Sequence, residues 1–328
     1  MRFVLRRLGF FAVTLWAAIS FNFVIPRLMP GNPVEAQMAH HQGQLTFQET
    51  KALDVAFGIG LHQNFWSEYF QYWNNVFHLN FGLSFTYFPT PVSNVIAHSL
   101  PWTIILVGMS VIIAWVLGTI VGIIAGWRRG SAWDLTLPAG AFFRGIPTFW
   151  IGLIAVSVFG VRLGWVPVSG GYSTNVVPSW TWAFIGSAVH HSILPALTII
   201  LGSIAGNLLG MRNMMVATLT EDFVLVGEAK GLPGHRVMFR YAARNAILPS
   251  VVGFALELGF VVSGALLVEQ VYSYPGIGYV LFQAVGSEDY PLMQAIFLII
   301  TLAVLLANIL ADVVFVIIDP RTRQGAIA

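Results

Sequence analysis

Residues 100–126, LPWTIILVGMSVIIAWVLGTIVGIIAG, contain no acidic or basic side chain and are apolar at most positions. A helix needs about 20 mostly apolar residues to cross the roughly 30 Å hydrocarbon layer of a bilayer, so this stretch is long enough to span a membrane. Its apolar residues form a continuous run and do not alternate with polar ones. The pattern therefore favours a helix over a strand of a closed barrel.

Five further runs are also long and mostly apolar, although four of them contain one or two charged residues. They cover approximately residues 8–29, 143–161, 193–211, 248–272 and 292–318. The chain is 57% hydrophobic and only 9% charged, whereas soluble domains average about 25% charged residues. The sequence thus predicts an all-α integral membrane protein with six transmembrane helices.

The basic residues orient this bundle. If the N-terminus is cytoplasmic, only three basic residues lie outside: Arg27, Lys51 and Arg162. The inner face then carries Arg2, Arg6, Arg7, Arg128, Arg129, Arg212, Lys230, Arg236, Arg240, Arg244, Arg321 and Arg323. The positive-inside rule predicts that both termini are cytoplasmic. Because these residues also meet anionic lipid headgroups, the net charge of +2 needs no nucleic-acid partner.

The predicted topology divides the chain into four parts. Residues 1–30 hold the first transmembrane helix, 31–99 an extracytoplasmic segment, 100–318 the transmembrane core with a cytoplasmic loop at 212–247, and 319–328 a cytoplasmic tail. The start has a basic head and an apolar run, but the run is long and no small-residue cleavage site follows, which favours a retained anchor over a cleaved signal. Without cysteine, the chain has no disulfide and no thiolate catalysis.

Within the outer segment, FWSEYFQYWNNVF at 65–77 has aromatic residues at helical spacing and predicts an amphipathic helix. Packing at the outer interface and stacking against a sugar are both open interpretations of these rings.

The cytoplasmic loop predicts a short helix from Glu221 to Lys230. Thr220 can cap its N-terminus, and Gly231 suits a left-handed stop. Four consecutive apolar residues fall inside this helix: Phe223, Val224, Leu225 and Val226. Apolar surface on a cytoplasmic loop indicates a binding partner. A plain anchor on lipid headgroups would explain the basic residues of the loop, but not a capped helix with an apolar surface.

Behind this helix, Arg236, Arg240 and Arg244 repeat every four residues. This spacing places them on one face of a second helix that leads into the fifth span.

The loop sequence EDFVLVGEAKGLPGHRVMFRYAARNAILP, residues 221–249, resembles the cytoplasmic loop of the permease subunits of ATP-binding-cassette (ABC) importers, in the peptide, nickel and oligosaccharide branch. Other landmarks of that family follow in order along nearly the whole chain. They are PGNP at 30–33, GIPTFWIGL at 145–153, GWVPVSGGY at 164–172, ILPALTI at 193–199, EQVYSYPGIG at 269–278, DYP at 289–291 and DPRTR at 319–323.

This resemblance implies a type I ABC importer permease fold in the plasma membrane of a prokaryote, with the short helix docked on an ATPase subunit. The residues implied in ATPase coupling are Phe223, Leu225, Glu228, Ala229, Lys230, Gly231, Arg236, Arg240 and Arg244. Leu225 and Glu228 depart from the family, which often has basic residues there. The implied partners are a second homologous permease, two ABC ATPase subunits and an extracytoplasmic solute-binding protein.

The chain itself lacks a G-x-x-x-x-G-K-[ST] loop, so ATP and Mg are expected on the partner ATPases and no cofactor on this chain. Peptides are the favoured cargo, because the branch is mostly peptide-linked; an oligosaccharide or a metal chelate such as nickel stays open. A secondary carrier would show paired internal repeats, and a membrane enzyme a clustered acid, base or metal set; neither pattern occurs in the sequence. The adjacent pairs His40–His41 and His190–His191 are poor chelators because neighbouring side chains diverge.

Glu257 lies about nine residues, or roughly 13 Å, into the fifth span. An ionisable carboxyl group at that depth in the membrane costs free energy, so it is expected to have a structural or functional role. It either lines the central passage and contacts a polar or cationic substrate, or forms hydrogen bonds between helices. Near the outer end, Glu269 is expected to be a structural cap, and the loop with Pro275, Gly276 and Gly278 resembles the family segment that meets the binding protein.

Overall fold

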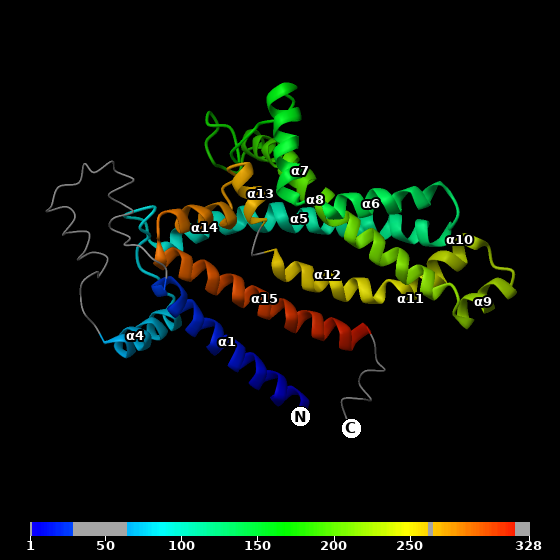
Figure 1. Cartoon of the computed structure of the whole chain (residues 1–328), viewed down its shortest axis with the longest axis horizontal. Helices are drawn as coiled ribbons and strands as arrows, with labels where there is room; N and C mark the ends of the chain where they lie inside the picture. The colour runs from blue at the N-terminus through cyan, green and yellow to red at the C-terminus, as the bar shows by residue number, and fades with distance from the viewer. Residues whose placement is uncertain (1, 29–63, 262–264, 319–328) are drawn as a thin grey trace.

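Long apolar helices form the body of the protein. The structure is a computed structural model that describes residues 2–28, 64–261 and 265–318. Its four longest helices are α1 (Arg2–Leu28), α5 (Val92–Trp127), α8 (Trp182–Thr218) and α15 (Tyr290–Ile318) (Figure 1). The described residues contain no strand, only an isolated bridge between Leu83 and Pro91. The predicted all-α class is therefore confirmed.

Shorter helices connect or cover these four. They are α4 (Phe65–Phe77), the 3₁₀ helix η1 (Ala132–Leu135), α6 (Thr136–Gly145), α7 (Thr148–Ala155), the π-helix η2 (Val156–Arg162), α9 (Asp222–Ala229), α10 (Gly234–Val237), the π-helix η3 (Met238–Ala243), α11 (Arg244–Ala246), α12 (Leu248–Phe260), α13 (Leu266–Val271) and α14 (Ile277–Gly286).

Three described helices are long and apolar enough to cross a membrane: α5, α8 and the Tyr290–Ala311 part of α15. A bent pair of helices makes a fourth if it is one span. The count of six spans stays a prediction.

Two of the expected spans are not single helices. In the run at 143–161, the helices on either side of Pro147 meet at 92°. The residue before a proline is disfavoured in the α conformation, and Ile146 is extended with ψ 126°. In the run at 248–272, α12 ends at Phe260 and α13 begins at Leu266. The expectation of one continuous helix is wrong at both places.

The most extensive helix–helix contact lies between α5 and α8. Gly118, Gly122 and Gly126 recur every four residues on α5 and face α8. A Cβ atom added to Gly122 would lie 2.7 Å from the backbone oxygen of Leu208, and one added to Gly126 would lie 2.5 Å from the Cβ of Met215. Glycine at these positions lets the two backbones approach closely, as in other membrane helix pairs.

At the end predicted to face outward, Glu269 joins α13 to α14. Its buried carboxylate accepts hydrogen bonds from the backbone nitrogens of Gly278 (2.7 Å) and Tyr279 (3.3 Å) and from the hydroxyl of Thr103 (2.8 Å). Thr103 in turn accepts a bond from the nitrogen of Ile277 (2.7 Å). The predicted structural cap is confirmed, since the carboxylate satisfies free amides at the start of α14.

A second buried acid, Asp289, begins α15. Its carboxylate accepts hydrogen bonds from the Ser84 hydroxyl (2.5 Å), the Thr86 nitrogen (2.9 Å) and the Leu292 nitrogen (3.1 Å). Burial raises the pKa of the Asp289 carboxyl, and these hydrogen bonds oppose that rise. The loop before α5 is thereby held against the start of α15.

The predicted amphipathic helix is α4, which packs against α1. The ring of Phe23 on α1 is fully buried and contacts Tyr69 and Tyr72, with centroids 5.3 and 5.5 Å away. Trp66 and Phe77 are exposed, so these two of the aromatic residues at helical spacing do not lie on the inward face. The rings on the inward face are engaged in packing.

The two ends of the bundle are distinct. In Figure 1 the beginning of α1 and the end of α15 lie toward the end that carries α9, α10 and α11, whereas α4 and α14 lie toward the opposite end. This arrangement fits a topology in which both termini share a side with the loop. The expected outer residues 31–63 and the tail 319–328 lie outside the described residues.

Candidate functional site

The predicted loop helix exists as α9, eight residues long. Only a narrow stripe of α9 faces the protein: Val224 is 1% exposed, and Gly227 is buried against the ring of Tyr241. Most of the circumference of α9 is therefore available to a partner.

The outward surface of α9 is rich in apolar atoms. Phe223, Leu225 and Val226 are 36%, 52% and 48% exposed. Glu228, Ala229 and Lys230 complete this surface and are also exposed. We call these six residues the α9 surface. Of the four consecutive apolar residues expected to be exposed, Val224 is the exception, because the helix needs one apolar contact to attach to the body.

The two ends of α9 differ in how well they were predicted. Gly231 has φ +67°, which confirms the left-handed stop. Thr220 is not the N-cap: its hydroxyl bonds to the carbonyl of Ala217 (3.0 Å), and Glu221 occupies the cap position without a side-chain cap bond. That prediction is wrong because the preceding turn at the end of α8 takes the threonine hydroxyl.

The second arm of the loop runs through α10, η3 and α11 into α12. Arg236, Arg240 and Arg244 are all exposed on it. The middle of this arm is a π-helix, so the spacing of four does not follow a regular α-helix there. The loop thus presents an apolar helix followed by a basic arm.

An apolar cluster fastens the loop to the long helices. Val224 of α9 and Val237 of α10 are buried together with Ile123 of α5 and with Met211 and Met215 of α8. Met211 and Met215 are the same residues that pack against the glycines of α5. The loop is therefore attached to the helix pair with the most extensive contact in the bundle.

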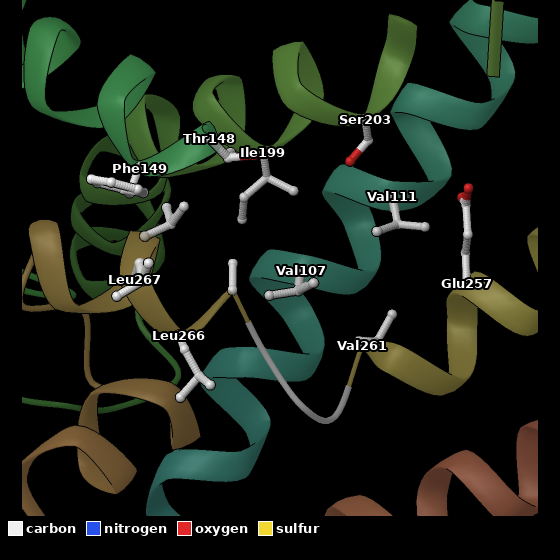
Figure 2. A pocket seen from close by; sticks show the side chains of 12 residues that line it. Val107, Val111, Thr148, Phe149, Ile199, Ser203, Glu257, Val261, Leu266 and Leu267 are labelled. Carbon is white, nitrogen blue, oxygen red and sulfur yellow. The ribbon is translucent and has the colours of Figure 1, made fainter. Parts of the chain in front are cut away.

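A cavity of about 630 Å³ lies farther along the same helices (Figure 2). Its wall is mostly apolar and comes from α5, α7, α8, α12, Val261 and the start of α13: Val107, Val111, Thr148, Phe149, Ile199, Ser203, Glu257, Val261, Ala265, Leu266, Leu267 and Val268. Figure 2 shows Glu257 on one side of this cavity and Phe149 with Leu267 on the opposite side.

Glu257 therefore lines a cavity, as one of its two interpretations requires. It also lies beside the polar side chain of Asn207 of α8, on a neighbouring helix, as the other requires. The second oxygen, Oε2, is buried and has no hydrogen-bond partner.

The outer loop with Pro275, Gly276 and Gly278 is tightly packed. Both glycines are buried, and a Cβ on Gly276 would overlap the carboxylate of Glu269. The close approach, and not a positive φ, requires glycine there. A contact between this loop and a binding protein stays a prediction, and it would have to use neighbouring exposed atoms such as those of Ser273.

His190 and His191 take separate hydrogen bonds, to the carbonyls of Trp165 and Ser187, and their rings are 86° apart. Residues 40 and 41 lie outside the described part of the chain.

Sequence reasoning missed two features of this region. The glycine spacing at 118, 122 and 126 was readable as a small-residue stripe, which is a known signal for close helix pairing in membranes. The partnership of Asn207 with Glu257 had no such signal, because it depends on how α8 and α12 pack in space.

Apolar helices of spanning length, an open, mostly apolar cavity between them and a surface helix at one end are features of a membrane transport subunit. The chain belongs to the family described as binding-protein-dependent transport system inner membrane component, which matches residues 118–324. It is accordingly a multi-pass protein of the prokaryotic plasma membrane.

Relatives of known name match over almost their whole length. The di/tripeptide transport system permease protein DppB of Pseudomonas aeruginosa is 33% identical, covering 99% of both chains. The dipeptide transport system permease protein DppB of Escherichia coli is 32% identical, again over 99% of both. The oligopeptide transport system permease protein AppB of Bacillus subtilis is 30% identical over 97% of this chain and 98% of its own.

Proposed function

We propose that this chain is a membrane-spanning subunit of an ATP-driven importer of di- or oligopeptides. It forms the translocation pathway together with a second, similar permease, receives its solute from an extracytoplasmic binding protein, and is driven by two ABC ATPase subunits that hold ATP and Mg²⁺. The names of the relatives support the peptide cargo.

The observation that carries the proposal is the α9 surface. A water-facing helix that exposes phenylalanine, leucine and valine while burying only one narrow stripe is unfavourable unless a partner covers it. Its exposed apolar face suits a hydrophobic groove on another subunit. The basic arm behind it lies beside the headgroup layer in the predicted topology.

The attachment of α9 suggests how force would reach the cavity. A partner that pulls on α9 moves Val224 and, through it, Met211 and Met215 of α8. Because α8 is packed backbone to backbone against α5, the two helices move as one body. Val107 and Ser203, which line the cavity, lie on these two helices. Closure of the ATPases would thus change the shape of the cavity without any covalent chemistry in this chain.

The test is purification of the complex from native membranes through an affinity tag on this chain, followed by uptake assays in the same strain. We expect two ATPase chains and a second permease to remain bound through size exclusion, and labelled trialanine to enter cells in an ATP-dependent manner. A stable complex without an ATPase would contradict the coupling role. Uptake of an oligosaccharide or a nickel chelate, but of no peptide, would contradict the cargo.

A further inference from the structure

The cavity contains one acidic side chain in an otherwise neutral wall. Among its lining residues only Glu257 is ionisable, and two others, Thr148 and Ser203, carry hydroxyl groups. The rest of the wall is apolar. A carboxylate placed in apolar surroundings is costly unless a cation or several hydrogen bonds compensate for it.

Side chains of the protein satisfy only part of the hydrogen-bonding capacity of this carboxyl group. Asn207 of α8 lies beside the carboxyl group, and Oε2 is buried with no hydrogen-bond partner. No lysine, arginine or histidine is among the described residues that line the cavity. Buried polar atoms in proteins are nearly always hydrogen-bonded, so a buried oxygen atom without a partner needs an explanation.

The occupant that fits this wall is a monovalent cation with an apolar remainder. A bound metal ion fits poorly, because the described residues hold no group of three or more histidine, cysteine, aspartate or glutamate side chains that could bind one. An ammonium group presents several donors in a small volume, and the volume of about 630 Å³ lies inside the range of about 300–1,000 Å³ typical of sites for small organic ligands.

We propose that Glu257 is the solute-recognition residue of the passage and that its carboxylate, where it lines the cavity, receives the protonated amino group of the transported peptide. Asn207 holds the carboxyl group in place from α8, and the apolar side chains around Phe149 and Leu267 accept the uncharged part of the solute (Figure 2). This inference rests on the proposed function as a peptide permease.

The experiment measures initial uptake of two labelled probes, trialanine and alanyl-lysyl-alanine, in cells whose only copy of the chain is wild type, Glu257→Gln or Glu257→Asp. Glu257→Gln keeps the size but removes the charge. We expect it to lower uptake of both peptides about tenfold, because it removes a charge-assisted contact. Glu257→Asp keeps the charge and should retain uptake within about threefold of wild type.

A charge exchange separates recognition from a structural role. In the double variant Asn207→Asp with Glu257→Gln, the pair can still form a hydrogen bond, but the carboxylate comes from α8. We expect uptake by this double variant to return to within about threefold of wild type. If the pair has only a structural role, the single variant Glu257→Gln and the double variant should show the same uptake. Assembly of every variant with its partners is checked by size exclusion.

The outcomes are distinct. An equal loss for both probes supports a contact with the amino terminus, whereas a loss confined to alanyl-lysyl-alanine overturns that assignment in favour of a side-chain ammonium. Unchanged uptake of both peptides by Glu257→Gln overturns the inference and leaves the proposed function intact. If Glu257→Gln does not assemble with its partners, the double variant Asn207→Asp with Glu257→Gln takes its place. A tenfold loss of peptide uptake in that assembled double variant overturns the inference. If wild-type cells import neither peptide, the proposed function fails first.

Discussion

The two ends of the bundle are held together by different kinds of interaction. At the end predicted to face outward, the carboxylates of Glu269 and Asp289 are buried and together accept hydrogen bonds from four backbone amides. At the opposite end, α9 is held by hydrocarbon contacts through Val224. Directional bonds to buried charges define one geometry, whereas apolar contacts tolerate sliding and tilt. The outer end thus has the properties of a fixed frame, and the α9 end those of a movable joint.

The largest expected effect is at the fixed end. Glu269→Ala removes the acceptor for Gly278, Tyr279 and Thr103 and should destabilise the protein by about 3 kcal/mol or more, since buried bonds to a charged group are involved. Thermal unfolding in detergent, followed by tryptophan fluorescence, measures it. Glu228→Ala, on the exposed surface of α9, is the matched control and should change stability by less than about 0.5 kcal/mol. Equal unfolding temperatures for the two variants would remove the distinction between the ends.

The next effect concerns the link between the ends. Gly122→Ala places a Cβ 2.7 Å from the backbone oxygen of Leu208 and forces α5 away from α8. Overpacking of this kind costs about 2 kcal/mol. Gly206→Ala, on α8 with no atom within 4 Å of the added Cβ, is the control and should be neutral or slightly stabilising. The same unfolding assay compares them, and a neutral Gly122→Ala would show that the two helices adjust separately.

A smaller stability effect, but a large functional one, is expected at the joint itself. Val224→Ala removes two buried methyl groups, for about 1.5 kcal/mol, and loosens α9 from Met211 and Met215. Peptide uptake should fall more than the yield of folded chain. Val226→Ala, which shortens an exposed side chain of α9 by the same two methyls, should leave the unfolding temperature unchanged. If both variants lower that temperature equally, α9 is not held by Val224.

The smallest expected effect is at the turn that ends α9. Gly231→Ala must adopt φ +67°, which costs a residue with a Cβ about 1 kcal/mol. Gly234→Ala, at the start of α10 where the backbone is not left-handed, is the control. We expect ATPase activity of the complex to respond less to added peptide in Gly231→Ala than in Gly234→Ala. An identical response would mean that the turn does not set the direction of the basic arm.

Local signals in the sequence predicted local structure well. Continuous apolar runs predicted α5, α8 and α15, and the glycine after Lys230 predicted the end of α9, because each depends on neighbouring residues alone. Pro147 was visible as a helix breaker, yet the run around it was interpreted as one span, since apolar character outweighed the effect of one proline. The bend of 92° follows from that residue.

Features that need two distant segments were not predictable in the same way. The inward position of Val224, the position of Asn207 beside Glu257, and the burial of Gly276 beneath Glu269 all depend on how helices pack in space. A charged group inside a membrane costs free energy, so the sequence indicated that Glu257 and Glu269 each have a structural or functional role. Only the packing separates the two cases: both oxygens of Glu269 accept hydrogen bonds, whereas Oε2 of Glu257 is buried without a donor.

The central claim is that the α9 surface binds an ATPase subunit, and the absence of cysteine from the chain allows a direct test. Leu225→Cys and, as a control on the exposed face of α4, Phe77→Cys provide single attachment points for a short photo-activated cross-linker in native membranes. The account predicts that Leu225→Cys cross-links to an ABC ATPase chain and that Phe77→Cys does not. If Leu225→Cys gives no ATPase adduct, or reacts with a membrane-impermeant maleimide added outside intact cells, the coupling role of α9 is contradicted.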